Sequence, residues 1–235
     1  HEWQLEAAFS DKTAAVAYLF SPGVSKMALS LDRVCEIAHS KGVPVIVDAA
    51  SMLPPRENLS KYHRLGADLV IHSGGKGIRG PQGTGILSGK KELIKAAYAN
   101  ASPHQFLGRS AKVAKEEIVG LLTALNNFVN EDEQVENVDF RNKSQKVVDA
   151  FSETPGLDAA VKHDKEDYLT PISSLYFTDE WEGPKAGEIL QRLKEGDKPI
   201  FMSNLIHPNE IIFDPLNVAD DEVDVVIKKI RESMD

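Results

Sequence analysis

The 235-residue sequence is 42% hydrophobic and 27% charged, which indicates a globular protein with one large or two modest domains. Its formal net charge is −9 and it has no basic block, so nucleic acid is an unlikely partner, because phosphate backbones are bound by clustered Lys and Arg. No signal peptide is visible, and no apolar run reaches the roughly 18 residues that a membrane span needs.

Apolar runs and turn residues predict alternating strands and helices in the first half of the chain. Buried parallel strands are continuous apolar segments, and such segments are found at residues 13–20, 43–47, 67–71 and 84–87. Predicted helices cover residues 31–40, 59–65, 90–100 and 117–128, and the first of them is bounded by Ser30 and Gly42. This order predicts an α/β fold with a mostly parallel sheet flanked by helices.

The pattern changes after an acidic block at residues 130–138, which we interpret as a hinge or an exposed helix face. Short strands are predicted at residues 157–161, 172–177, 200–206 and 211–213, and helices at 145–153, 185–195 and 220–234. Hairpin strands combined with helices are typical of an α+β layer. We therefore expect a large domain at residues 1–125 and a smaller C-terminal α+β domain at residues 126–235.

Two charged side chains follow predicted strands of the large domain. Asp48 closes one apolar run, and Lys76 lies in a glycine-rich loop just after the next. Ligands of open α/β sheets bind beyond the carboxyl ends of the strands. An amine and a carboxylate placed there can hold pyridoxal phosphate, the amine as a Schiff base and the carboxylate on the pyridinium nitrogen. An ion pair between the two side chains is the alternative interpretation.

The glycines favour the cofactor interpretation. Six of the twelve residues from 74 to 85 are glycine, and glycine allows positive φ and a close approach of the backbone to a ligand. A P-loop is excluded because Gly77, rather than Ser or Thr, follows Lys76. The sequence also lacks the histidine spacing of a zinc site and the serine motif of a hydrolase, so no metal is predicted.

Three segments carry a family resemblance. SGGKGIRGPQGTGIL, residues 73–87, resembles the lysine loop of fold-type-I pyridoxal-phosphate enzymes, and is most similar to the selenocysteine-synthase-like group that includes D-glucosaminate-6-phosphate ammonia lyases. VIVDAAS (45–51) resembles the aspartate strand of that group, and GRSAKVAKEEIVGLLTAL (108–125) resembles the segment that follows. The resemblance runs from about residue 13 to the C-terminus. It implies that the large domain binds the cofactor and that residues 84–87 run antiparallel.

The same resemblance implies a longer protein and an assembly. Members of the family carry a further N-terminal part, so we expect this chain to be a fragment. The missing part would hold the glycine turn that grips the cofactor phosphate and the aromatic side chain that stacks on the ring. Fold-type-I enzymes are usually dimers with shared sites, so a homodimer or higher homo-oligomer is expected.

The resemblance also implies roles for individual residues. Lys76 would bind the cofactor and act as the general base, and Asp48 would keep the ring nitrogen protonated. Ala50 is small enough to leave room for a flat ring, and Ser73 could donate its hydroxyl to the cofactor phosphate. The ordinary alternatives are a surface lysine, a capping or ion-paired aspartate and a turn-forming serine.

Arginine and lysine side chains in the following segment are candidates for the substrate. Arg109 and Lys112 could bind a carboxylate or phosphate, and Arg79 could face the site of a neighbouring subunit. Solvated surface charges are an equally good interpretation of all three. His72 at a strand end is more often structural, and we leave it outside the catalytic set.

The function implied is a pyridoxal-phosphate-dependent lyase that eliminates water and ammonia from an amino acid or amino sugar acid. A D-glucosaminate-6-phosphate-type substrate is the first choice. The alternatives are a selenium transferase acting on seryl-tRNA(Sec) and a non-catalytic fold-type-I scaffold used for binding or assembly. The single cysteine, Cys35, cannot form an internal disulfide and is interpreted as a small core residue, which suits a cytoplasmic location.

Overall fold

A computed structural model describes residues 1–164 and 167–235. The chain forms two compact units, His1–Glu131 and Asp132–Asp235, which we call unit 1 and unit 2. In the ranges described, none of the helices is long and apolar enough to cross a bilayer.

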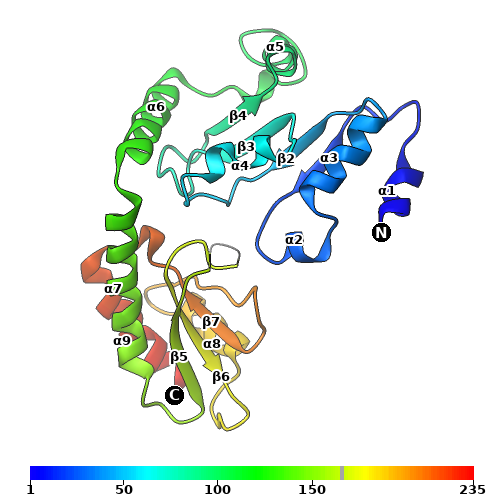
Figure 1. The fold of residues 1–235 in the computed structure, drawn as a ribbon. Helices are drawn as coiled ribbons and strands as arrows, with labels where there is room; N and C mark the ends of the chain where they lie inside the picture. Colours follow the sequence, from blue (N-terminus) through cyan, green and yellow to red (C-terminus); the bar gives the residue numbers. More distant parts are fainter. Residues whose placement is uncertain (165–166) are drawn as a thin grey trace. The chain divides into compact units, whose positions relative to one another are not determined.

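Unit 1 is built around a four-stranded sheet (Figure 1). Its strands, in spatial order, are β1 (Val16–Leu19), β2 (Val45–Asp48), β3 (Leu69–Ser73) and β4 (Gly85–Gly89). The first three are parallel, and β4 pairs with β3 in the antiparallel direction. The predicted α/β fold with a mostly parallel sheet is therefore confirmed, and so is the antiparallel direction of its last strand.

Helices of unit 1 precede β1, β2 and β3 and follow β4, whereas β3 and β4 are joined by a loop. The helices are α1 (Glu2–Ala8), α2 (Val24–Met27), α3 (Leu31–Ser40), α4 (Asn58–Arg64), α5 (Lys91–Asn100), the short 3-10 helix η1 (Arg109–Ala111) and α6 (Lys115–Asn130). Helix α3 has the predicted bounds. Gly42, which lies two residues after its end, has a φ of +70°, a left-handed conformation that favours glycine at a helix end.

The two faces of the unit 1 sheet differ in burial. Tyr18, Val47 and Val70, which lie in register across β1, β2 and β3, are all buried. The adjacent register positions point the other way, and there Leu19 is 53% exposed and Ile71 36%. Side chains alternate between the faces of a strand, so Asp48, which pairs with both Leu19 and Ile71, belongs to the exposed face.

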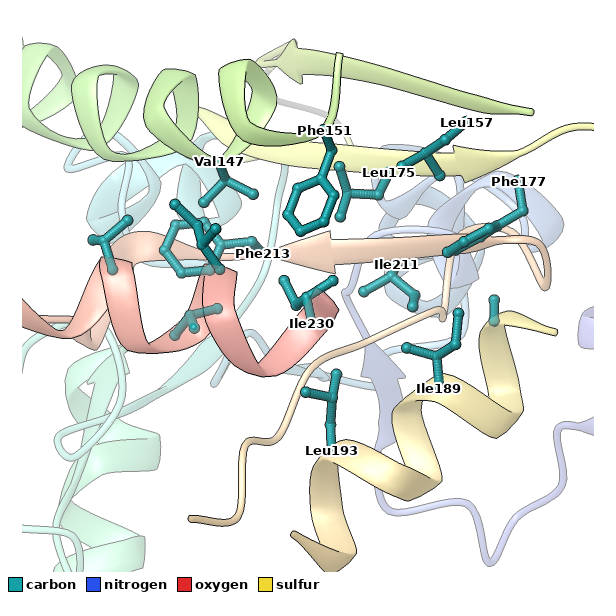
Figure 2. Packing of buried hydrophobic residues seen from close by; sticks show 14 residues of the cluster. Val147, Phe151, Leu157, Leu175, Phe177, Ile189, Leu193, Ile211, Phe213 and Ile230 are labelled. Carbon is teal, nitrogen blue, oxygen red and sulfur yellow. The ribbon is translucent and has the colours of Figure 1, made fainter. Parts of the chain in front are cut away.

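Unit 2 is an α+β layer with a core of its own. Strands β5 (Leu157–Lys162), β6 (Ile172–Phe177) and β7 (Glu210–Phe213) form an antiparallel sheet in that order. Helices α7 (Glu133–Phe151), α8 (Ala186–Glu195) and α9 (Val223–Met234) contribute apolar side chains to the same core. Figure 2 shows Phe151, Leu175 and Ile211 among the side chains that meet there.

Two predictions for unit 2 were wrong. Residues 200–206 do not form a strand, and only an isolated bridge joins Ser203 to Ile212. Helix α7 begins at Glu133 rather than near residue 145, so most of the acidic block is helical. The Asp132 side chain accepts a 2.8 Å hydrogen bond from the backbone N–H of Gln134 and starts this helix, whose first turns are mostly solvent-exposed.

Candidate active site

Two candidate residues share one edge of the unit 1 sheet. Asp48 ends β2 and pairs with Ile71 of the neighbouring parallel strand β3. Ser73 ends β3 two residues later, so its side chain projects from the same face as Asp48. The Asp48 Oδ1 atom accepts a 3.0 Å hydrogen bond from the backbone N–H of Ala50. The turn after β2 thus orients an exposed carboxylate at the carboxyl edge of the sheet.

Lys76 lies in the turn that follows β3. Its side chain is exposed, whereas the residues on both sides of it, Gly75 and Gly77, are buried. Ile78 anchors the turn, because its side chain is 3% exposed and clusters with Leu53 and Phe128. The loop is held against the body of unit 1 while the amine of Lys76 remains accessible.

The glycines of this loop serve a different purpose from the one expected. None of the six, from Gly74 to Gly85, has a left-handed φ, and the positive φ in the loop belongs to Arg79, at +61°. A Cβ at Gly77 would lie 2.0 Å from the carbonyl oxygen of Leu53, and one at Gly74 would lie 2.1 Å from Thr84 Oγ1. These glycines are therefore required because the loop packs closely on the chain itself.

The ion-pair alternative for Asp48 and Lys76 does not describe the structure. Neither side chain forms an ion pair with any residue of 1–164 or 167–235. An exposed amine and an exposed carboxylate without counter-ions are free to engage a ligand. This arrangement fits a cofactor that needs one group of each kind.

Arg109 and Lys112 lie on a separate segment, which leads from η1 into α6. Lys112 is exposed, whereas Arg109 is half-buried and its Nε atom is buried without a hydrogen-bond partner among the described residues. Buried donors are normally satisfied, so this nitrogen is suited to an anion. Helix α6 borders the lysine loop, because a Cβ at Gly83 would lie 2.9 Å from Glu117 Oε1.

His72 lies on the covered face of the sheet, opposite to Ser73. It is 1% exposed, and burial lowers the pKa of its imidazole. Its ring faces Tyr62 of α4 at a centroid distance of 6.1 Å, and burial raises the pKa of that phenol. The structure places His72 in the layer beneath the loop. Among the residues described, no group of three or more His, Cys, Asp or Glu side chains could hold a metal ion.

Sequence reasoning missed the side chains that brace the lysine loop. Gln82 Nε2 donates a 2.9 Å hydrogen bond to the Gly75 carbonyl, and Thr84 Oγ1 donates a 2.6 Å bond to the Pro81 carbonyl. The segment Pro81–Thr84 was interpreted only as part of a glycine-rich motif. The one available signal was the presence of polar side chains within an otherwise glycine-rich turn.

The relatives of this chain carry the names of several different enzymes. It is 32% identical over 98% of its length to a D-glucosaminate-6-phosphate ammonia lyase from Salmonella typhimurium, and covers 60% of that protein. A 5'-C-glycyluridine monooxygenase-decarboxylase from Streptomyces sp is 28% identical over 96% of the chain and 55% of the relative. An L-seryl-tRNA(Sec) selenium transferase from Clostridium perfringens is 30% identical over 59% of the chain and 31% of the relative.

A solved structure and a family model match as well. The structure of a D-glucosaminate-6-phosphate ammonia-lyase superimposes with a TM-score of 0.74 and 31% identity, over 100% of this chain and 61% of that one. The chain thus spans about 60% of the relatives that match it over nearly all of its length. The family model described as aminotransferase class-V matches residues 2–125. A UPF0425 pyridoxal phosphate-dependent protein from Methanothermobacter thermautotrophicus is 45% identical over 30% of the chain and 19% of the relative. The chain belongs to the aminotransferase class-V family.

Proposed function

We propose that this chain provides the cofactor lysine, Lys76, of a pyridoxal-phosphate-dependent lyase. The observation that carries the proposal is an exposed lysine between two buried glycines, Gly75 and Gly77, in the loop that follows β3, the strand paired with the strand of Asp48. The reaction would eliminate water and ammonia from an amino acid or amino sugar acid. A D-glucosaminate-6-phosphate-type substrate is supported by the similarity to the Salmonella typhimurium lyase over 98% of the chain.

The residues at the sheet edge fit this cofactor. When bound, pyridoxal phosphate supplies an electron sink for negative charge that develops at the substrate Cα. Lys76 would offer the amine that holds the cofactor aldehyde, and the same amine, once released, would act as the base for the substrate Cα proton. The Asp48 carboxylate would accept a hydrogen bond from the ring nitrogen and so keep that nitrogen protonated. The Ser73 hydroxyl would donate to a phosphate oxygen, and Ala50 would leave space for the ring.

The substrate would be bound through its anionic groups. Arg109 has a buried Nε with no partner among the described residues, which suits a carboxylate or phosphate that accepts from the guanidinium fork. Lys112, three residues later, is exposed and would add a second positive charge. An amino sugar acid phosphate carries both kinds of anion, so two cationic side chains match it.

The alternatives have less support. The selenium transferase from Clostridium perfringens matches 59% of the chain, against 98% for the lyase, and an acidic chain suits a tRNA partner poorly. A non-catalytic scaffold would have no need of an unpaired lysine and an unpaired aspartate at one sheet edge. We therefore place the lyase first, the transferase second and the scaffold third.

The wider organisation is part of the same proposal. We assign cofactor binding to residues 1–125, supported by the family match over residues 2–125, and assign residues 126–235 as the small domain. A homo-oligomer is supported by the exposed apolar side chains Leu19, Leu87 and Leu122 of unit 1. A cytoplasmic location is supported by Cys35, the single cysteine of the sequence, which cannot form an internal disulfide.

Borohydride reduction in the presence of pyridoxal phosphate tests the role of Lys76. We expect reduction to fix the cofactor on Lys76, detected by peptide mass spectrometry, and Lys76→Ala to abolish this label. Lys95→Ala, which removes an exposed lysine of α5, is the matched control and should leave the label at Lys76 intact. A label spread over surface lysines, with no preference for Lys76, would contradict the proposal.

Two further assays separate the candidate reactions. Ammonia release from D-glucosaminate 6-phosphate is expected from protein that has been supplied with pyridoxal phosphate and not reduced. If reduction labels Lys76 specifically but no ammonia is released, the lyase is rejected and the cofactor site is retained. Retention of tRNA at low salt, lost at high salt, would instead favour the transferase.

A further inference from the structure

The lysine loop is closed by a second turn that packs against it. The first turn contains Gly74 and Gly75, and the second runs from Gly80 to Thr84. Two backbone hydrogen bonds bind them to each other: the N–H of Gly74 donates to the Thr84 carbonyl at 3.0 Å, and that of Gly80 donates to the Gly74 carbonyl at 2.8 Å. Neither bond involves the peptide group between Gly75 and Lys76.

Gln82 makes the side-chain contact that reaches this peptide. Its Nε2 atom donates a 2.9 Å, half-buried hydrogen bond to the carbonyl oxygen of Gly75, the group that links Gly75 to Lys76. A Cβ at Gly75 would lie 2.6 Å from the Cα of Gln82 and 2.7 Å from its Oε1. The absence of a side chain at residue 75 is what permits this approach.

The peptide that follows Lys76 is held by other contacts. The Lys76 carbonyl accepts a 2.9 Å bond from the N–H of Arg79, which closes the turn, and Gly77 lies against the Leu53 carbonyl. Gln82 therefore fixes the orientation of the carbonyl that precedes Lys76, and the turn fixes the carbonyl that follows it. Together they set the direction in which the Lys76 side chain leaves the backbone.

We infer that Gln82 is a positioning residue for the Lys76 amine: its amide holds the Gly75–Lys76 peptide in the orientation that presents the amine to the cofactor. The inference rests on the proposed role of Lys76. It adds that an accessible lysine at this position is insufficient, because an amine must be held near its target for the covalent step to be efficient.

Replacement of the amide by a carboxyl group gives the sharpest test. Gln82→Glu keeps the shape of the side chain, but an ionised carboxylate has no proton to donate and repels the Gly75 carbonyl oxygen. A protonated carboxyl group regains a donor, so the hydrogen bond can re-form at low pH. Gln82→Met has a similar length, has no donor at any pH and should show no recovery. Gln105→Glu places the same charge on an exposed residue of unit 1 and serves as the control.

Hydrogen exchange of the Arg79 and Gly80 amides, measured without cofactor, shows how strongly the lysine loop is protected from local opening. At neutral pH we expect these amides to exchange about two- to twelvefold faster in Gln82→Glu and Gln82→Met than in the parent chain at the same pH, the change that corresponds to one hydrogen bond. Near pH 4 only the Glu variant should return towards the parent rate. Equal exchange in all variants, or recovery by Met as well, would overturn the inference.

A second measurement tests whether a loosened loop slows attachment of the cofactor. It is the rate at which borohydride fixes pyridoxal phosphate on Lys76 at pH 8. Both Gln82 variants should be slowed several-fold at Lys76, while background labelling of Lys95 and the behaviour of Gln105→Glu stay unchanged. A loosened loop with an unchanged rate at Lys76 would show that Gln82 is only structural. If the parent chain is not labelled at Lys76, the proposed function fails, whereas the exchange data still decide whether Gln82 holds the loop.

Discussion

Asp68 joins three parts of unit 1 at the end of the sheet away from the lysine loop. This carboxylate is 1% exposed and accepts a 2.7 Å bond from the backbone N–H of Val45. His39 Nε2 lies 2.8 Å from it, and Lys90 Nζ lies 2.5 Å from it. Burial alone would raise the pKa of the Asp68 carboxyl, but the bonds from Lys90, His39 and Val45 outweigh that effect and lower it.

We expect Asp68→Asn to lower the free energy of unfolding at pH 7 by about 2 kcal/mol, because hydrogen bonds to a buried charge are lost. The folded-state pKa lies below the unfolded value, so the carboxylate stabilises the fold above about pH 4. That contribution disappears as the pH falls through the folded-state pKa. Urea unfolding between pH 7 and pH 3 should show the two proteins converging. The exposed control, Asp11→Asn, should match the parent throughout.

At the scale of single residues, the position of charged side chains just after strands could be predicted from the sequence, but long-range pairing could not. Asp48 and Lys76 were predicted because each follows an apolar run within a few residues. Asp68 stood inside a predicted strand and gave no signal, because its partners Lys90 and His39 are distant in the sequence. The roles assigned to Asp48 and Lys76 remain predictions.

Among the elements, the lysine loop is the one whose shape depends most on missing side chains. A Cβ at Gly77 would lie 2.0 Å from the Leu53 carbonyl oxygen, a backbone atom that cannot move without the chain around it. At Gly85, by contrast, a Cβ would meet only the His72 carbonyl, at an ordinary 3.4 Å.

Gly77→Ala should therefore displace the loop, lower the free energy of unfolding by about 1–3 kcal/mol and weaken cofactor labelling at Lys76. Gly85→Ala is the matched variant and should change neither quantity appreciably. Urea unfolding and peptide mass spectrometry after borohydride reduction measure the two effects. Equal behaviour of both alanine variants would show that close packing at Gly77 does not shape the loop.

Helices and strands were predicted correctly where their buried residues form a regular apolar pattern in the sequence. Helix α3 was predicted with its observed bounds, because its apolar residues have helical spacing and Gly42 ends it. The first half of α7 was missed because its exposed, polar turns carry no apolar pattern. The strand predicted at residues 200–206 was wrong because an apolar run alone does not supply a neighbouring strand with which to pair.

The whole chain has two separate hydrophobic cores, and damage to one should spare the other. Ile211 is fully buried in the core of unit 2 (Figure 2), whereas its neighbour Ile212 is only partly buried. We expect Ile211→Ala to destabilise unit 2 by about 3 kcal/mol, because it removes buried methyl groups and leaves a cavity. Ile212→Ala should cost about 1 kcal/mol or less.

Hydrogen exchange resolved by peptide distinguishes the units. Faster exchange in Ile211→Ala should be confined to residues 132–235, and peptides from 1–131 should match the parent. Comparable loss of protection in both ranges would mean that the two units unfold as one. The change from strand–helix alternation to hairpin strands indicated two layers of different kinds, and the structure has a mostly parallel sheet in unit 1 and an antiparallel sheet in unit 2.

The exposure of Lys76 amid buried neighbours has an evolutionary consequence. Its side chain contributes little to packing, so a single codon change there could remove the amine while the protein kept folding and accumulating normally. Gene copies that lost catalysis in this way would escape quality control and could be recruited as binding proteins. The presence or absence of this amine, and not a change in the fold, would then distinguish catalytic members of the family from non-catalytic ones.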